Sequence, residues 1–426
     1  MFVGREKEIK SLSELWEKET ASLVVCRGRR RIGKSTLIEE FARVSKAAFV
    51  KIEGLAPKSG VTNKTQLESF ARQLGAISGR PVATPANWFE AFDLLDRKLR
   101  RKSRTVVLID EISWMGKYDA AFPGELKMSW DNKLKRHPNH IFVLCGSVSS
   151  WVADNIVNST AYFGRISRDI VVDELPLRDA VKFWGAKASR LAVREITDVL
   201  SVTGGVPKYL EDVNPSLSAV ENIRRLCFRA DGLLFSDFNE IFNAVLGDSI
   251  SVKREILEKL SAGPMSCAEL AESMQIARGG TLFRNLDELE KAGFVAKGGG
   301  LNPETGKQAR ADRYRLKDNY TRFYLKYIEP HEEQIRAGGF EGIDLEGLPE
   351  WNAVMGLQSV FVVEIKRKRE IGEEVESEVS RKVARLSIRK DRSVRTVLVY
   401  DGDLHPIVRS NAYFDALIDI ADLMKQ

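Results

Sequence analysis

Eight consecutive residues near the start of the chain have the types and spacing that bind phosphate. The run Gly28-Arg29-Arg30-Arg31-Ile32-Gly33-Lys34-Ser35 satisfies the pattern G-x-x-x-x-G-K-[ST]. Its glycines let a loop wrap so that backbone N–H groups point at phosphate oxygens, and the start of a following helix attracts the same anion. In such a loop Lys34 reaches the β- and γ-phosphates and the Ser35 hydroxyl binds Mg²⁺. The pattern predicts a triphosphate site that also includes Arg31, Ile32 and Thr36.

An acidic pair supplies the second half of this predicted site. Asp110 ends the apolar run 105–110, and Glu111 follows it directly. Because ligands bind at the carboxyl ends of strands in open α/β sheets, we expect the Asp110 carboxylate to help hold Mg²⁺ beside the loop. Glu111 is then placed to polarise an attacking water. These residues predict an ATPase with ATP and Mg²⁺ as cofactors.

Base-reading elements of guanine nucleotide proteins are missing from the sequence. The usual element is N-K-x-D, and two runs begin with its first two residues. Asn63-Lys64-Thr65-Gln66 and Asn132-Lys133-Leu134-Lys135 both lack the aspartate. The base is therefore expected to be adenine.

The elements that must position these residues are visible as apolar runs in the first 175 residues. Residues 22–26, 47–52, 105–110 and 141–145 are nearly continuous apolar segments, and residues 35–43 carry helical spacing. Such strands, separated by helices, indicate a parallel sheet covered on both faces. The fold class expected for 1–175 is α/β, with the parallel sheet of a P-loop NTPase core.

Three further regions follow this core. Residues 176–250 are mostly helical in pattern and form an expected lid, with a turn at Gly204-Gly205-Val206-Pro207. Residues 251–330 show three amphipathic segments and two short strands (294–296 and 313–316), which is the element order of a winged helix. Residues 350–426 run helix, strand, helix, strand, helix, and predict a small α/β tail.

Several short segments together resemble a known family. Val3-Gly4-Arg5-Glu6, the phosphate loop, Leu108-Ile109-Asp110-Glu111 and Gly146-Ser147 resemble the AAA+-related archaeal and bacterial ATPases of the STAND group, as does the glycine–proline turn of the lid. The resemblance implies that Gly4 and Arg5 lie on the adenine side and that Ser147 senses the γ-phosphate. It also implies that Arg165 is directed at a nucleotide, in its own subunit or in a neighbour within a homo-oligomer. The alternative for Arg165 is a surface arginine on a turn.

The region 251–330 carries basic residues that fit duplex DNA. Residues 281–291 take the place of a recognition helix, with Arg278 and Arg284 as expected DNA contacts. The wing offers Lys297, Lys307 and Arg310 to phosphates. The alternative is a packing module, because the same helix also carries three acidic residues, namely Asp287, Glu288 and Glu290.

The tail contains a strand that ends in E-x-K. Glu364 and Lys366 in this strand resemble the PD-(D/E)xK core of restriction-endonuclease-like folds, in which an Asp, a Glu and a Lys surround a divalent metal. The strands and the aspartate that precede this motif in such folds are missing here, and Asp344 lies before the only intervening helix. We therefore expect a shortened remnant, with a metal-dependent nuclease as the alternative.

Composition limits the classes of protein to which this chain can belong. The net charge of +6 is mild, and no apolar run approaches the ~18 residues that span a bilayer. The start lacks the apolar core of a signal peptide, and four well-separated cysteines indicate neither a disulfide framework nor a zinc site. We expect a cytoplasmic protein without a membrane partner. The expected function is a slow ATPase that acts as a nucleotide-dependent regulatory switch, with a DNA-binding module or a nuclease as alternatives.

Overall fold

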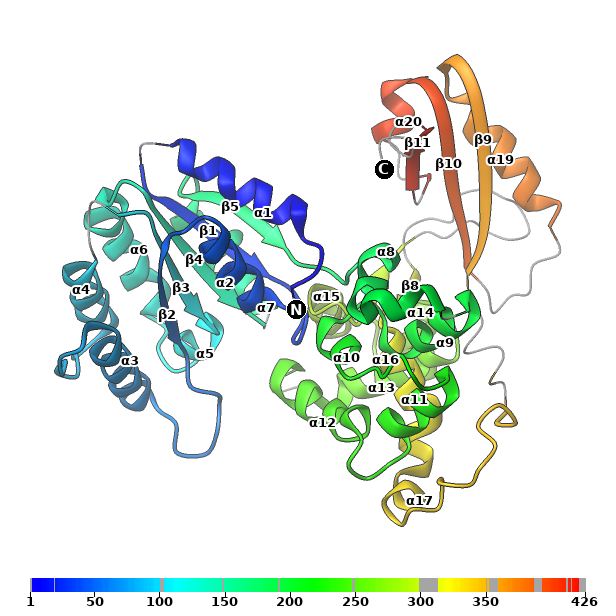
Figure 1. The fold of residues 1–426 in the computed structure, drawn as a ribbon, viewed down its shortest axis with the longest axis horizontal. Coiled ribbons are helices and arrows are strands. Elements are labelled where there is room, and N and C mark those ends of the chain that lie inside the picture. Colours follow the sequence, from blue (N-terminus) through cyan, green and yellow to red (C-terminus); the bar gives the residue numbers. More distant parts are fainter. Residues whose placement is uncertain are drawn as a thin grey trace.

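The fold has three visible parts: an α/β core, a mostly helical middle and a small α/β tail (Figure 1). The computed structural model describes residues 2–18, 20–99, 103–147, 149–190, 192–246, 250–298, 313–349, 351, 359–386, 393–410, 413–414 and 416–420. None of the described helices is both long and apolar enough to span a membrane.

The core is built on a parallel sheet of five strands in the order β2-β3-β4-β1-β5. Four of these strands lie where the apolar runs predicted them. The fifth, β5, was missed because its residues Ser167, Arg168 and Asp169 interrupt the apolar pattern, as an edge strand with one neighbour allows. The strands are β1 (Ser22–Arg27), β2 (Ala48–Glu53), β3 (Thr105–Asp110), β4 (His140–Gly146) and β5 (Ile166–Val171).

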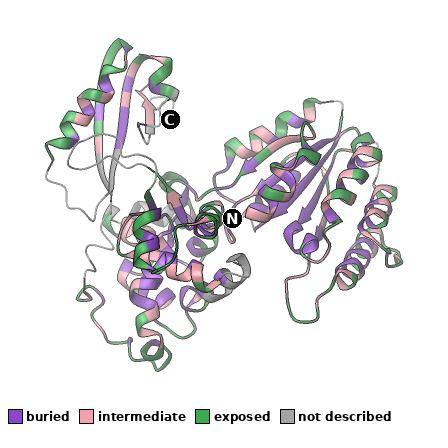
Figure 2. Ribbon diagram, turned by 180° about the vertical axis from the view of Figure 1, so that it is seen from behind, coloured by how far each residue is buried: buried purple, intermediate pink, exposed green. Residues whose placement is uncertain are grey.

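Alternate residues of each central strand pack into separate hydrophobic clusters on the two faces of the sheet. Val24 and Val143 point to the face covered by α1 (Glu6–Ser13) and α2 (Lys34–Val44). Val25 and Leu144 point to the other face, where aromatic side chains of α3, α4 and α6 pack. Figure 2 shows these central strands as buried. The core helices and turns after α2 are α3 (Asn63–Ser78), α4 (Trp88–Lys98), α5 (Ile112–Gly116), α6 (Phe122–Asn132), η2 (Leu134–Arg136), α7 (Ser149–Val152), η3 (Ala153–Val157) and η4 (Thr160–Tyr162); η1 (Glu14–Glu17) follows α1.

The predicted lid region is helical and shares its hydrophobic core with the α2 side of the sheet. One cluster runs from Phe41 and Val24 of the core through Tyr209 and Phe238 of the lid to Phe323. The lid elements are α8 (Leu177–Ala180), η5 (Val181–Arg190), α9 (Val193–Thr203), α10 (Pro207–Glu211), α11 (Ala219–Cys227) and α12 (Leu233–Leu246).

The next region contains helices and a three-stranded antiparallel sheet in the order β6-β8-β7. The Ser266 side chain accepts from the backbone N–H of Glu269, so the expected capping box is present. Strand β6 is too short to show in the apolar pattern. The elements are α13 (Ile250–Ser261), β6 (Met265–Ser266), α14 (Cys267–Ser273), α15 (Gly280–Lys291), β7 (Val295–Lys297), β8 (Arg313–Leu316), α16 (Asn319–Phe323), η7 (Tyr324–Ile328), η8 (Glu329–His331) and α17 (Glu332–Arg336).

The tail is a parallel sheet of three strands in the order β11-β10-β9, with its own hydrophobic cluster. Its elements are β9 (Ser359–Ile371), α19 (Glu374–Ala384), β10 (Ser393–Leu404), α20 (Pro406–Ser410) and β11 (Ala416–Asp419). The prediction of a single final helix was wrong, since a short helix is followed by a strand that pairs with β10. The helix expected over 351–358 lies outside the described residues except for Trp351.

Candidate nucleotide site

The predicted phosphate loop lies between β1 and α2, at the carboxyl edge of the sheet (Figure 1). Gly33 caps α2 with a φ of 85°, and Gly28 has a φ of 154°. A Cβ on Gly28 would lie 2.3 Å from the carbonyl oxygen of Val172, so the chain after β5 leaves room for glycine alone. Arg31 also has a positive φ, of 68°. The protein's own backbone therefore holds the loop in a wrapped shape.

Lys34 is folded back into this loop. Its ammonium donates to the carbonyl oxygens of Gly28 at 3.0 Å and Arg29 at 2.9 Å, and its side chain is buried. A phosphate oxygen is a stronger, charge-assisted acceptor than either carbonyl. The lysine is thus already inside the loop and can exchange carbonyl oxygens for phosphate oxygens.

The two residues expected to hold Mg²⁺ are in direct contact. The Ser35 hydroxyl donates to Oδ2 of Asp110 at 2.6 Å, while Oδ1 of Asp110 accepts the backbone N–H of Glu111 at 3.0 Å. Asp110 is only 4% exposed. Hydroxyl and carboxylate oxygens suit Mg²⁺, which is usually bound by one or two protein groups together with phosphates and water. These two residues fit the metal, because Mg²⁺ bound to a nucleotide needs no larger cluster of protein ligands.

Glu111 is held by the residue predicted to be the phosphate sensor. Its Oε2 accepts the Ser147 hydroxyl at 2.7 Å and the Ser147 backbone N–H at 3.3 Å. Glu111 itself has a φ of 50° and caps α5, so the chain turns sharply there. Ser147 follows β4 and Glu111 follows β3, which are neighbouring strands. The serine therefore controls where the carboxylate points.

A cavity of about 400 Å³ joins the loop to the lid. Its volume falls within the range of small-ligand pockets. The glycine–proline turn lies against the loop, because Cγ of Pro207 is 3.7 Å from the Cβ position of Gly33. The cavity is lined by Arg30, Arg31, Gly33, Lys34, Ser35, Thr36 and Glu111 of the core and by Pro207, Lys208 and Glu211 of α10.

The three arginines of the loop are each bound to a different element. Arg29 forms an ion pair with Asp318 at the start of α16, and Arg31 forms one with Asp237 of α12. Arg30 lies over the Trp114 ring, 5.7 Å from its centroid. The loop is thus bonded to the lid and to the region after β8.

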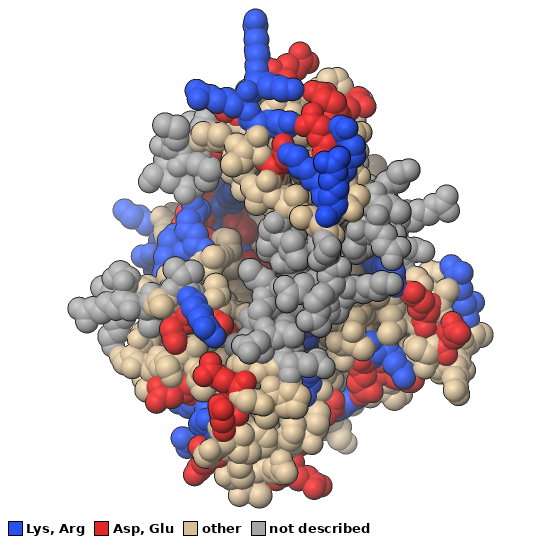
Figure 3. Space-filling view, turned by 90° about the vertical axis from the view of Figure 1, so that its right-hand side faces the viewer, with Lys and Arg blue, Asp and Glu red and all other residues tan. Residues whose placement is uncertain are grey.

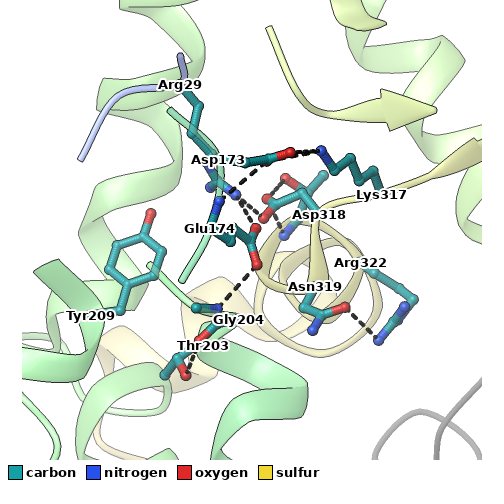
Figure 4. Close-up of polar contacts among 12 residues, drawn as sticks. Arg29, Asp173, Glu174, Thr203, Gly204, Tyr209, Lys317, Asp318, Asn319 and Arg322 are labelled. Atoms are coloured by element: carbon teal, nitrogen blue, oxygen red, sulfur yellow. Dashed lines mark hydrogen bonds and ion pairs between the residues drawn. The ribbon is translucent and has the colours of Figure 1, made fainter. Parts of the chain in front are cut away.

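Arg29 is the centre of a buried polar network (Figure 4). Its Nη1 lies 3.1 Å from Glu174, whose other oxygen accepts the backbone N–H of Gly205 at 3.0 Å. Asp318 also accepts the backbone N–H of Thr321 at 2.9 Å, which caps α16. Burial by itself would lower the pKa of Arg29. The nearby carboxylates of Asp318 and Glu174 have the larger, opposite effect, so the pKa of Arg29 lies above its usual range.

Gly4 and Arg5 lie behind the phosphate loop. The Arg5 guanidinium donates to the carbonyl oxygens of Ile32 at 3.3 Å and Asp173 at 2.5 Å. A Cβ on Gly4 would lie 3.0 Å from the Asp179 carboxylate of α8. Arg5 therefore supports the loop backbone, and its contact with a base stays a prediction.

Arg165 does not reach the phosphate loop of its own chain. It precedes β5, and Ile166 pairs with Leu23 near the start of β1, whereas the loop begins after Arg27. Five strand residues of ~3.3 Å each separate the two ends. The guanidinium instead binds both oxygens of Asp131 in α6 at 2.9 Å, and this contact lowers the pKa of Asp131 to about 2. Within its own subunit Arg165 is thus bound away from the loop, and action on a neighbour stays a prediction.

The basic residues expected to bind DNA are exposed. Arg284 points outward from α15 and forms no ion pair with the described residues. Arg278 contacts the Cys267 thiol, and Lys297 lies 5.7 Å from the centroid of the Tyr314 ring. Lys307 and Arg310 lie outside the described residues.

Glu364 and Lys366 of the tail are engaged in ion pairs. Glu364 binds Lys382 of α19 at 2.5 Å and Lys366 at 3.4 Å, and Lys366 also binds Glu378. The described residues contain no group of three or more His, Cys, Asp or Glu that could hold a metal. Figure 3 shows basic and acidic side chains mixed over the tail at the top of the view. Asp344 instead bonds the backbone of Glu346.

The phosphate loop lies between a strand and a helix of a parallel α/β sheet, and the acidic pair follows the strand two places away. This arrangement defines a P-loop ATPase-like domain. Residues 2–213 match the family described as the ATPase domain predominantly from Archaea. Through this half, the chain belongs to that family of archaeal-type ATPases.

Individual proteins are similar to this chain in sequence or in fold. An uncharacterized protein of Methanocaldococcus jannaschii is 21% identical over 87% of this chain and 79% of its own length. An uncharacterized ATP-binding protein of the same organism is 44% identical over 10% of this chain and 70% of its own length. The Walker-type ATPase PABY2304 of Pyrococcus abyssi has a similar fold, with a TM-score of 0.55, 16% identity and coverage of 76% of this chain and 96% of that one.

Sequence reasoning missed the partners of the loop. Asp318 and Glu174 lie far along the chain from Arg29, in segments without a recognisable motif. Lys51 of β2 was also missed, although its ammonium lies 3.5 Å from Oδ2 of Asp110. The only available signal was a lysine inside an otherwise apolar strand.

We predict that Gly28→Ala disrupts the loop. The new Cβ would collide with the Val172 carbonyl at a φ that L residues rarely adopt, so the loop must shift. Binding of a fluorescent ATP analogue, measured by anisotropy, should fall at least ~10-fold, as expected when one or two charge-assisted contacts are lost. Gly124→Ala is the matched control, because nothing lies within 4 Å of its Cβ position. Equal affinity of the two variants would show that the loop is not the binding site.

Proposed function

We propose that this protein is a Mg²⁺-dependent ATP-binding switch with slow ATPase activity. In this proposal the phosphate loop binds ATP, and its occupancy changes the position of the lid and of residues 251–330. Membership in the archaeal ATPase family supports the nucleotide assignment. The observation that carries the switch is the buried ion pair between Arg29 of the loop and Asp318.

The hydrolytic half of the proposal rests on four residues. Lys34 and Ser35 bind phosphate oxygens and the metal, and Asp110 keeps the Ser35 hydroxyl oriented. Glu111 is held by Ser147 at the side of the same cavity, where it can accept a proton from an attacking water. Mg²⁺ would offset phosphate charge when it is bound.

The coupling half rests on where the loop is anchored. Lys34 donates to the carbonyl oxygen of Arg29, and the Arg29 side chain binds Asp318 and Glu174. When Lys34 turns to a phosphate, the backbone at Arg29 loses a donor and can move. The movement is passed to α16 because breaking a buried ion pair on one side costs about 3–5 kcal/mol. By linkage, the position of α16 must then alter nucleotide affinity.

Two variants should separate binding from turnover. Lys34→Ala removes a charged phosphate contact, so affinity for mant-ATP should fall ~10- to 100-fold. Glu111→Gln should bind mant-ATP normally but hydrolyse ATP ~100-fold more slowly or worse, because it cannot act as a base. Phosphate release and mant fluorescence measure the two properties. Equal mant-ATP binding by wild type and Lys34→Ala would remove the proposed function.

The coupling is tested by Asp318→Asn, which keeps an acceptor for the α16 cap but removes the charge. In the wild type, Mg·ATPγS should change amide hydrogen exchange both in the phosphate loop and in α15, β7 and α16. In Asp318→Asn the loop response should remain, and the response of the distant segments should be lost.

Lys317→Met is the matched control for this experiment. Lys317 is the preceding residue, and its ion pair with Asp173 is exposed, so it is expected to contribute little. If Asp318→Asn and Lys317→Met both responded like the wild type, the Arg29–Asp318 pair would not transmit nucleotide binding.

DNA contact is a second candidate function, favoured by the exposure of Arg278, Arg284 and Lys297. Arg284 is free of ion pairs among the described residues and lies on the outer face of α15. The other end of this helix is tied to the core, where Lys291 binds Asp154 at 3.0 Å. A surface of this kind would bind duplex DNA mainly through phosphates.

The DNA proposal predicts salt-dependent retention of duplex DNA. Arg284→Ala should weaken binding and reduce the slope of log affinity against log salt by about 0.9, the value for one lost phosphate contact. The slope is measured by the anisotropy of a labelled duplex at several salt concentrations between about 50 and 200 mM, because salt screens the attraction between the protein and the phosphates. Lys135→Ala, an exposed lysine in η2 of the core, is the control. Absence of any binding at low salt would contradict DNA contact.

A further inference from the structure

Lys51 lies beside the residues that fit the metal. It belongs to β2, the edge strand next to β3, and its Nζ is 3.5 Å from Oδ2 of Asp110. The same ammonium is 3.2 Å from Oε1 of Glu39, on α2. Lys51 therefore bridges a carboxylate of the nucleotide site and a carboxylate outside it.

The contact falls on the oxygen of Asp110 that also accepts the Ser35 hydroxyl. The other oxygen is occupied by the backbone N–H of Glu111. A metal held by Ser35 and steadied by Asp110 would have to approach this shared oxygen. The Lys51 ammonium thus stands on the side from which a second cation would come.

Lys51 is flanked by two carboxylates, those of Asp110 and Glu39. Its side chain is 33% exposed, whereas the side chain of Asp110 is 5% exposed. Among the described residues, Asp110 is therefore a buried carboxylate paired with a lysine that also contacts Glu39 and is partly open to solvent.

We propose that Lys51 is a resident cation that competes with the divalent metal for Asp110 and that, when the metal binds, gives up Asp110 and keeps its contact with Glu39. The inference rests on the proposed function, because it concerns the metal of the same nucleotide site. Lys51 is a positioning residue in this scheme, since it acts through Asp110. Its effect is to raise the metal concentration at which the site is half-filled.

The physical reason is repulsion between like charges that share one counter-ion. In the metal-free site, Lys51 supplies the positive charge that a buried carboxylate needs. A hydrated Mg²⁺ at the same carboxylate must displace it, and the partly exposed pair is only moderately screened. Glu39 lowers this cost by keeping its contact with the displaced ammonium. Removal of Lys51 and removal of Glu39 should consequently act in opposite directions.

The test measures metal binding directly, with Mn²⁺ as the probe and mant-ADP present. Free Mn²⁺ is quantified by electron paramagnetic resonance in the full chain. Lys51→Met keeps much of the side chain without its charge, and should lower the half-saturating Mn²⁺ concentration about 3- to 10-fold. Lys51→Arg should stay near the wild type. Lys135→Met removes an equally ordinary surface lysine far from Asp110 and should change nothing.

A double-mutant cycle checks the role of Glu39. Glu39→Gln should raise the half-saturating Mn²⁺ concentration in the wild type. The same change in a Lys51→Met background should have a clearly smaller effect, since no ammonium remains for Glu39 to bind. Equal effects in both backgrounds would show that Glu39 acts only through its own charge.

A second measurement separates metal competition from a merely structural role. In EDTA, Lys51→Met should unfold at a lower temperature than the wild type, because Asp110 has lost its cation. With Mg·ADP this difference should shrink or reverse. If Lys51→Met had wild-type Mn²⁺ binding while Lys34→Ala still lost mant-ATP, this inference would be wrong and the proposed function would stand. If the wild type bound neither nucleotide nor metal, the proposed function itself would fail.

Discussion

In-register parallel pairing of β1, β3 and β4 is the constraint on which the site depends. Arg27 of β1 lies beside Gly146 of β4, and Ile109 of β3 lies beside Leu144 of β4. Because all three strands run the same way, the segments that follow them emerge at one edge of the sheet. The phosphate loop, the acidic pair and Ser147 meet there. The same constraint carries Arg165 to the opposite edge, since it precedes β5 rather than following it.

Charge compensation connects this edge to the rest of the molecule. The three arginine side chains of the phosphate loop carry like charges that repel one another. Each of them is bound to a partner in another element. Arg29 and Arg31 bind carboxylates beyond the core, and burial makes these ion pairs expensive to break. On the metal side, the buried Asp110 is compensated by Lys51. The site is therefore neutralised by its own protein charges, which a nucleotide and its metal must rearrange.

Prediction from sequence succeeded where a residue's role follows from its neighbours in the chain. Ser35 and Asp110 meet as expected because strand, loop and helix are local features with strong patterns. It failed for β5, whose exposed edge permits polar residues, and for the end of the tail, where β11 replaces part of a helix. Asp318 carried no pattern, and Lys51 stood out only as a lysine within an apolar strand. An isolated charge does not reveal its distant partner.

The sequence alone determined the chemistry of the loop, the identity of the acidic pair and the α/β class of the core, because these depend on short-range spacing and periodicity. Only the tertiary structure decided which of these groups compensate one another. It showed that Ser147 holds Glu111, that Arg29 reaches Asp318 and that Arg165 is bound to Asp131. Such pairings join residues far apart in the chain, and three-dimensional packing selects them.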